Sequence, residues 1–156
     1  MRTIEATQAA PGLRVAVVVS KYNDFVTERL QAGALAALAH VGVAGADITV
    51  IRVPGSFEIP FAAQRAAESG GFEAVVCLGC LIRGATAHFE YIASAAAHGI
   101  TAAAAATGIP IAFGVLTTNS VEEAIERAGD GPANKGWEAA IAAVEMAMVS
   151  RQLKRP

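Results

Sequence analysis

An α/β fold is the class that the sequence predicts: a single three-layer αβα domain with a four-stranded parallel sheet. Three observations predict it. Four short apolar runs rich in β-branched residues alternate with segments of helical period, and the links between them are short. No long linker, internal repeat or charged tail interrupts the 156 residues, a length that suits one domain.

The four apolar runs are predicted to be strands that are buried on both sides of the sheet, because each is β-branched and apolar on both faces. They are Leu13–Ser20, Asp47–Val53, Ala74–Leu81 and Ile111–Leu116. Right-handed crossovers through helices then connect consecutive strands, which makes the sheet parallel and the topology flavodoxin-like.

Two stripes of apolar residues at helical spacing predict helices that cover this sheet. They are Leu30, Ala34, Leu38 and Val41, and Trp137, Ile141, Val144 and Met148. Three further helices fit Glu58–Ser69, Ala87–Thr107 and Val121–Ala128. Ser120 and Glu123 have the spacing of a capping box at the start of the last one.

The composition is apolar and poor in charge, with 54% hydrophobic and 17% charged residues. An average globular chain carries about 25% charged residues, so this deficit favours a homo-oligomer that hides apolar surface between subunits. The 12 Lys and Arg against 14 Asp and Glu give a net charge of −2, without a basic patch in the sequence. We therefore expect no nucleic-acid partner and no membrane partner.

Cys77 and Cys80 form a single C-x-x-C motif, which occurs in redox pairs and in halves of zinc sites. The flanking residues are apolar and typical of strands, and the sequence has no second cysteine pair to complete a zinc site. Two buried thiols in a strand are the favoured interpretation, and no metal site is predicted.

Two segments bear on where the protein is located. The uncharged run Gly99–Thr118 approaches the roughly 20 residues that a membrane-spanning helix needs. Gly108 and Pro110 interrupt it, so a helix end followed by a buried strand explains it better. Residues 1–12 lack the apolar core of a secretory signal, and a cytoplasmic protein is expected.

Polar residues collect in the segments that follow the four predicted strands, where parallel sheets bind their ligands. These segments are Ser20–Asp24, Pro54–Glu58, Arg83–His88 and Thr117–Ser120. In the third, Thr86 is expected to cap a helix whose free N–H groups favour an anion such as phosphate. His88 in the first turn of that helix is a candidate for proton transfer near neutral pH.

Other candidates have two interpretations on the residues alone. Tyr22 and Phe57 begin neighbouring loops, where an aromatic ring either stacks on a planar heterocycle or packs against the core. Glu58 either accepts hydrogen bonds from ligand hydroxyls or complements a helix start. Arg127 is a cation at a helix end and Lys135 is a solvated charge, and both have ordinary structural explanations.

The same segments resemble the lumazine synthase family, in order and with the expected spacing, from about Arg14 to Met148. The matching motifs are SKYNDFVTERLQAGALAAL, VPGSFEIPFAAQ, GCLIRGATAHFEYIA, GIPIAFGVLTT, AIERAG and NKGWEAAIAAVEM. Several independent motifs agree, so the resemblance is specific. It divides the chain into an N-terminal segment, residues 1–12, and a lumazine synthase domain, residues 13–156.

The resemblance implies a transferase of riboflavin biosynthesis. The family condenses 5-amino-6-(D-ribitylamino)uracil with 3,4-dihydroxy-2-butanone 4-phosphate, releasing phosphate and water, without a metal or an organic cofactor. It also implies a homo-oligomer built from pentamers, in which each active site lies between neighbouring subunits.

The resemblance further assigns roles to single positions. It implies that Tyr22 stacks on the pyrimidine ring, that Glu58 accepts from the ribityl hydroxyls, and that His88 transfers protons. The other positions in the same subunit are Ser56 and Phe57 at the ribityl chain, Cys80, Leu81 and Ile82 at the pyrimidine edge, and Ala85 and Thr86 at the phosphate. From the adjacent subunit, Phe113 lies against the ring, Arg127 holds the phosphate and Lys135 lies nearby.

Two departures from the family pattern concern substrate contacts. Tyr22 replaces a phenylalanine that is usual there, and Cys80 replaces a common threonine. Readings from other classes remain open: a non-catalytic homologue that binds flavins or lumazines, a homologue selected for shell formation, and a flavodoxin-like electron carrier. The last is disfavoured because its phosphate loop belongs after the first strand, where this chain has SKYND.

Overall fold

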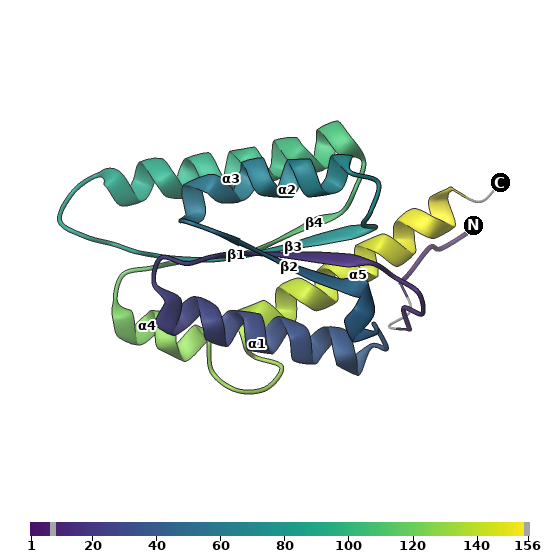
Figure 1. The fold of residues 1–156 in the computed structure, drawn as a ribbon, viewed down its shortest axis with the longest axis horizontal. Helices are drawn as coiled ribbons and strands as arrows, with labels where there is room; N and C mark the ends of the chain where they lie inside the picture. Colours follow the sequence, from purple (N-terminus) through teal and green to yellow (C-terminus); the bar gives the residue numbers. More distant parts are fainter. Residues whose placement is uncertain (7–8, 155–156) are drawn as a thin grey trace.

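A four-stranded parallel sheet lies between two layers of helices in the computed structural model, which describes residues 1–6 and 9–154 (Figure 1). The strands are β1 (Val15–Ser20), β2 (Ile48–Val53), β3 (Ala74–Ile82) and β4 (Ile111–Thr118). They pair in the order β2-β1-β3-β4, and every neighbouring pair is parallel. The predicted fold class is confirmed, with strand ends shifted by at most two residues.

The helices of the described residues cover both faces of the sheet. On one face lie α2 (Ile59–Glu68) and α3 (His88–Thr107), and on the other lie α1 (Asp24–His40), α4 (Val121–Arg127) and α5 (Lys135–Leu153) (Figure 1). The 3₁₀ turns η1 (Gly45–Asp47) and η2 (Ser56–Glu58) precede β2 and α2. All five helices follow the predicted order, and the stripe predicted for α1 is buried.

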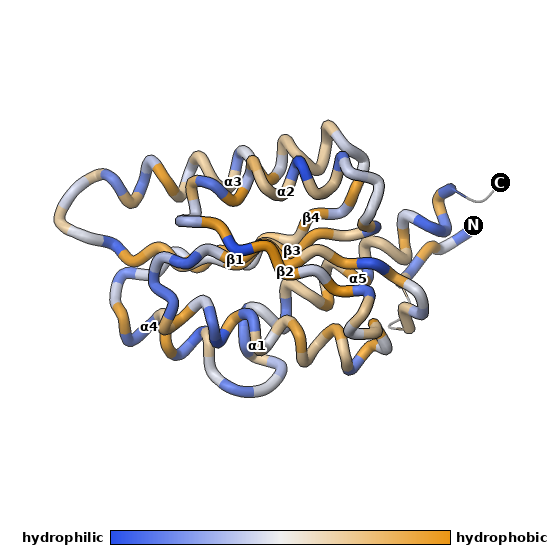
Figure 2. Tube along the Cα trace, viewed as in Figure 1, coloured by the Kyte–Doolittle hydropathy of each residue, from blue (hydrophilic) through white to orange (hydrophobic). Residues whose placement is uncertain are grey.

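Alternate residues of β1 pack against the two helical layers. Val15, Val17 and Val19 join the apolar cluster of α1 and α5, whereas Ala16 and Val18 join the cluster of α2 and α3. Hydrophobic residues follow the central strands in Figure 2, and hydrophilic residues gather on the outer helices and loops. Because both faces are covered, the ends of the strands are where the sheet is open to a ligand.

The two edge strands are more exposed than expected. All four strands were predicted to be buried on both faces, yet Val50 of β2 is 36% exposed and Phe113 of β4 is 48% exposed. An edge strand of one isolated chain has no neighbour on its outer side. The prediction is wrong for these two strands, and exposed apolar residues at both edges are typical of surfaces that another chain covers.

The buried face of α5 also differs from its predicted stripe. Trp137 and Ile141 are only half-buried, and the buried face is completed by alanines: Ala139, Ala140, Ala143 and Ala147. Small side chains let α5 approach its neighbours closely, and a Cβ added to Gly136 would overlap the backbone oxygen of Leu30 in α1. A stripe of large apolar residues does not reveal such a contact.

Both cysteines are free and buried in β3, so their interpretation as core thiols is confirmed. Burial raises the pKa of the Cys77 thiol far above its usual range and raises the pKa of Cys80 to about 11. Neither thiol is therefore ionised at neutral pH.

The uncharged run Gly99–Thr118 divides as predicted. Helix α3 ends at Thr107, Gly108 has a left-handed φ of 69°, and β4 begins at Ile111. Within residues 1–6 and 9–154, none of the helices combines the length and the apolar character that crossing a bilayer requires.

Candidate active site

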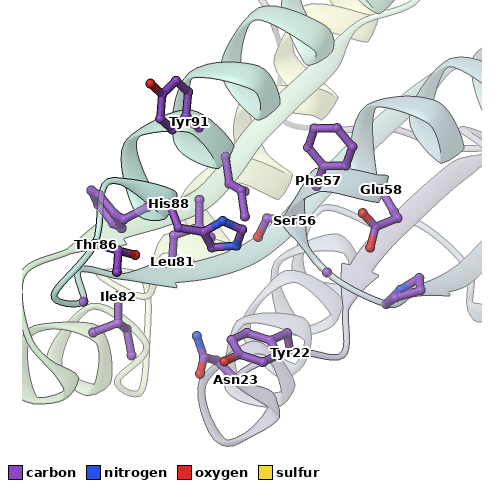
Figure 3. A pocket seen from close by; sticks show the side chains of 15 residues that line it. Tyr22, Asn23, Ser56, Phe57, Glu58, Leu81, Ile82, Thr86, His88 and Tyr91 are labelled. Carbon is purple, nitrogen blue, oxygen red and sulfur yellow. The ribbon is translucent and has the colours of Figure 1, made fainter.

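A cavity of about 820 Å³ opens where β1, β2 and β3 end (Figure 3). Most of the predicted site residues line it together: Tyr22, Ser56, Phe57, Glu58, Leu81, Ile82, Thr86 and His88. They come from three segments far apart in the sequence, which the parallel sheet brings to one edge. We call this cavity, with all the residues that line it, the first half-site.

Aromatic side chains stand at the mouth of the first half-site. Tyr22 is 71% exposed and Phe57 is 63% exposed, so neither ring packs into the core. Of the two interpretations left by the sequence, exposure favours a ring that is free to stack on a ligand. In Figure 3, Tyr22 and Phe57 lie on different sides of the cavity, and His88 reaches from the start of α3 toward Ser56.

Close backbone approach positions the segment that contains Ser56 and Glu58. A Cβ added to Gly79 of β3 would lie 2.7 Å from Ser56 Oγ and 3.0 Å from Ile59 Cδ1. Any larger residue at position 79 would push η2 away from the strand. The missing side chain therefore lets the η2 turn sit directly on β3, with Ser56 buried and Phe57 and Glu58 turned to the cavity.

Asn23 connects the loop after β1 with the end of β3. Its backbone is left-handed, with a φ of 59°, a conformation that asparagine tolerates better than most residues. Its Nδ2 donates to the carbonyl oxygen of Cys80 at 2.9 Å. Cys80 does not line the cavity: the residue is only 1% exposed.

The Gly84–Ala87 loop differs from its prediction in one respect. Thr86 lines the cavity, but it does not cap α3: the helix begins at His88, and Ala87 occupies the cap position without a side-chain hydrogen bond. The expected cap is wrong, since Thr86 is one residue too early. Ala85 is exposed in the same loop but does not line the cavity. The uncapped N–H groups of α3 remain available to an anion.

The charge of the first half-site is incomplete for an anionic ligand. Its fifteen lining residues include Glu58 and His88 but neither lysine nor arginine. A doubly charged phosphate needs a cation as well as backbone N–H groups for tight binding. That cation must come from outside this cavity.

Phe113, Arg127 and Lys135 lie together elsewhere, in a cavity of about 580 Å³ between β4, the end of α4 and the start of α5. No residue lines both cavities. These three are the residues that the resemblance places in an adjacent subunit. We call them the second half-site.

Surface ion pairs hold the cations of the second half-site. Lys135 Nζ lies 2.9 Å from Glu138 Oε2, and Arg127 Nη1 lies 3.9 Å from Glu123 Oε2, with all four side chains at least 41% exposed. Exposed pairs of this kind contribute little free energy, about 0–1 kcal/mol each. Both cations are therefore easily turned toward a ligand.

A buried asparagine fixes the backbone next to Lys135. Asn134 is 3% exposed, and its Oδ1 accepts from the N–H groups of Gly136 at 2.8 Å and Trp137 at 3.2 Å. Its Nδ2 donates to the carbonyl oxygens of Gly129 at 2.9 Å and Arg29 at 3.2 Å. This Asn134 latch caps α5 and ties it to α1 and to the loop after α4.

Several lining residues were not predicted as site residues. Tyr91, Phe89 and Ile92 follow His88 on α3, and Asn23 follows Tyr22. Tyr91 could have been predicted from its spacing to His88, because residues three apart in a helix share a face. Asn23 could have been predicted from the preference of asparagine for left-handed turns.

Comparison with known proteins shows the family of this chain. Residues 12–151 match the family model described as 6,7-dimethyl-8-ribityllumazine synthase. A protein of that name from Syntrophus aciditrophicus (strain SB) is 52% identical over 149 residues, which cover 96% of this chain and 97% of the relative. Another, from Desulfatibacillum aliphaticivorans, is 47% identical over 153 residues, which cover 98% and 99%. The chain belongs to the 6,7-dimethyl-8-ribityllumazine synthase family.

Proposed function

We propose that this protein makes 6,7-dimethyl-8-ribityllumazine in riboflavin biosynthesis, from 5-amino-6-(D-ribitylamino)uracil and 3,4-dihydroxy-2-butanone 4-phosphate. One observation carries the proposal: apart from Cys80 and Ala85, every predicted site residue lines one of two cavities, and the division follows the division between subunits that the resemblance implies. A chance gathering of polar loops would not reproduce that division.

In the proposed complex, the first half-site holds the uracil. Tyr22 is the exposed ring that stacks on the flat pyrimidine, and Phe57 stands at the same cavity. Glu58 accepts hydrogen bonds from the ribityl hydroxyls, and the end of β3 at Leu81 and Ile82 faces the pyrimidine edge. These contacts place the 5-amino group beside His88.

The proposed chemistry needs repeated proton transfer rather than a protein nucleophile. The amine of the uracil attacks the ketone to give a carbinolamine, which loses water to form an imine. Phosphate then leaves, and closure of the second ring releases a further water. No step is an oxidation or a reduction, so the proposal includes no redox cofactor, and the resemblance implies no metal. His88, whose side chain can donate and accept protons, serves these steps in turn.

Phosphate binding in this proposal uses both half-sites. The Gly84–Ala87 loop and the uncapped start of α3 offer backbone N–H groups. Arg127 of an adjacent subunit supplies the missing cation, and its guanidinium suits a phosphate because two of its N–H groups can bind two oxygens. Lys135 lies nearby, and Phe113 closes one side of the ring site.

The same division supports an assembly. The two half-sites lie in separate cavities of one chain, so head-to-tail contact between copies would complete a site at each interface. Exposed aromatic residues beside the first cavity fit such a contact: Tyr91 is 76% exposed and Phe61 is 74% exposed. Head-to-tail contacts form a ring when the rotation between neighbouring copies closes, and the resemblance implies a closed ring of five. We propose a cytoplasmic protein built from pentamers.

The test mixes the purified protein with both substrates and follows lumazine absorbance together with phosphate release. A control without protein is essential, because two such reactants condense slowly in water. We expect both signals to rise at matching rates that scale with protein concentration. A folded, assembled protein whose rate equals that of the control would overturn the proposed reaction and favour a binding homologue.

A further inference from the structure

Arg83 has no role in the proposed reaction, yet its side chain contacts three residues in two other segments of the chain. Its Nε donates to Asn119 Oδ1 at 3.0 Å, and its Nη1 donates to Glu90 Oε1 at 2.9 Å. Its guanidinium carbon lies 4.8 Å from the centre of the Phe89 ring. Arg83 thus joins the end of β3, the first turn of α3 and the turn between β4 and α4, a set of contacts that we call the Arg83 bridge.

The Arg83 bridge spans a loop that has little else to hold it. Gly84–Ala87 are all exposed, and Ala87 provides no side-chain cap. Apart from the chain neighbours of Gly84, none of the described residues has a heavy atom within 4 Å of a Cβ added there. Arg83 precedes this loop, and Phe89 and Glu90 follow it, so one side chain connects its two ends. The planar guanidinium can make all three contacts at once because its donors point in fixed directions.

The Asn119 contact extends the connection toward the second half-site. The backbone N–H of Asn119 donates to Glu123 Oε2 at 2.9 Å, and Glu123 is the carboxylate 3.9 Å from Arg127. The backbone N–H of Arg83 also donates to the carbonyl oxygen of Thr118 at 2.8 Å. Polar contacts therefore lead from the start of α3 to Arg127 within one chain.

We propose that Arg83 is a positioning residue, which holds the Gly84–Ala87 loop and His88 in place for the reaction through Glu90, Phe89 and Asn119. The inference rests on the proposed function. The Arg83–Glu90 ion pair alone is not sufficient, because the side chains of Arg83 and Glu90 are 48% and 64% exposed and such pairs are weak. The effect comes from three simultaneous contacts on one rigid group.

The first variant is Arg83→Met, which keeps the aliphatic stem and removes all three contacts. Small displacements of reacting groups cost up to about 100-fold in rate, so we expect kcat/KM to fall about 10- to 100-fold while the assembly persists. Arg14→Met is the matched control. Arg14 is an exposed arginine at the opposite end of β1, with one 3.4 Å hydrogen bond to the Gly70 carbonyl, and its loss should leave kcat/KM unchanged.

A second variant separates positioning from direct contact with substrate. The double change Glu90→Ala with Asn119→Ala keeps the Arg83 guanidinium but removes both of the side-chain oxygens that accept from it. If Arg83 acts by positioning, this variant loses about tenfold in kcat/KM. If the double variant behaves like the wild type while Arg83→Met is impaired, Arg83 acts on the substrate itself and the positioning role is overturned.

Amide hydrogen exchange supplies a readout that does not need turnover. In Arg83→Met, we expect the amides of Glu90 and Tyr91, which donate to the Ala87 carbonyl oxygen in the first turn of α3, to exchange at least about tenfold faster, with no change in Arg14→Met. Unchanged exchange in that segment overturns the bridge, and so does faster exchange with wild-type kinetics. A wild-type protein without activity would overturn the proposed function. The hydrogen-exchange rates alone would then show whether Arg83 holds the loop.

Discussion

The two half-sites of one chain supply different things to a ligand. The first half-site has aromatic rings, a carboxylate and an imidazole but neither lysine nor arginine. The second half-site has two cations and one exposed aromatic ring. The proposed reaction joins a flat heterocyclic substrate to a phosphorylated one, so it needs both sets of side chains. The comparison teaches that a single folded chain is chemically incomplete, although its fold is complete.

The half-sites also differ in how they are held. Two contacts fix the first half-site: the close approach of Ser56 to Gly79 of β3, and the hydrogen bond from Asn23 in the loop after β1 to the Cys80 carbonyl oxygen in β3. Helix ends and surface ion pairs hold the second, where Lys135 and Arg127 remain easy to redirect. The rigid half suits orientation of the ring, and the adjustable half suits capture of a charged group.

The largest expected effect is on the first half-site. His88→Ala should lower kcat by about 100-fold, near the low end of the 10²–10⁴ typical of acid–base residues, because positioning supplies much of the acceleration. Steady-state kinetics with both substrates measure it. His98→Ala changes another exposed histidine of α3, whose contacts are with Ser94, and should keep wild-type kinetics. Complete inactivity of an intact His88→Ala assembly would contradict this division of labour.

A smaller effect is expected from Arg127→Ala in the second half-site. A hydrogen bond to a charged group contributes about 1.5–3 kcal/mol, so the KM for the butanone phosphate should rise roughly 10- to 100-fold. The KM for the ribitylaminouracil should change little, because Tyr22 and Glu58 lie in the other cavity. An unchanged KM for the phosphate substrate would show that Arg127 does not bind the phosphate.

Mixing the two damaged chains tests whether the half-sites meet across an interface. After joint unfolding and reassembly of His88→Ala with Arg127→Ala at equal amounts, about one quarter of head-to-tail interfaces combine two intact halves. We expect about a quarter of wild-type activity, far above the sum of the separate variants. Activity equal to that sum would show that each site is contained within one chain.

The smallest effect concerns the thiol beside the first half-site. Burial raises the pKa of Cys80 to about 11, so its reactive thiolate forms only as the pH rises toward that value. At pH 7.5, a maleimide should leave the folded protein unlabelled and its activity unchanged, and should label two thiols per chain after unfolding. Rapid labelling of the folded protein would mean that the end of β3 opens.

The parallel sheet and most of the site could be predicted from the sequence for one physical reason. Strands that are buried on both faces appear in the sequence as apolar runs. Helical crossovers make these strands parallel, so their carboxyl ends lie at one edge of the sheet and the segments that follow them lie close together. That reasoning places Tyr22, Phe57 and His88 together without any contact being known. The division of Arg127 and Lys135 into a second cavity came only from the resemblance, since a cation at a helix end has an ordinary explanation.

The remaining features depend on contacts between distant segments, which local pattern does not encode. The Arg83 bridge was missed because Asn119 meets Arg83 across 36 residues of sequence. The predicted Thr86 cap was wrong because helix ends are set to within a residue by loop geometry, and α3 starts at His88. The exposure of Val50 and Phe113 follows from the sheet order, which composition cannot reveal.

The Asn134 latch limits the order in which substitutions can accumulate. A Cβ on Gly33 would collide with the Asn134 amide, and one on Gly136 would collide with the Leu30 backbone. Replacing Gly33 while Asn134 is present displaces an amide that bonds four backbone groups. If Asn134 changes first, the space near Gly33 opens and the same replacement is less costly. The effects of the two changes on the free energy of unfolding are therefore not additive. Whether a replacement of Gly33 is tolerated depends on whether Asn134 has already changed.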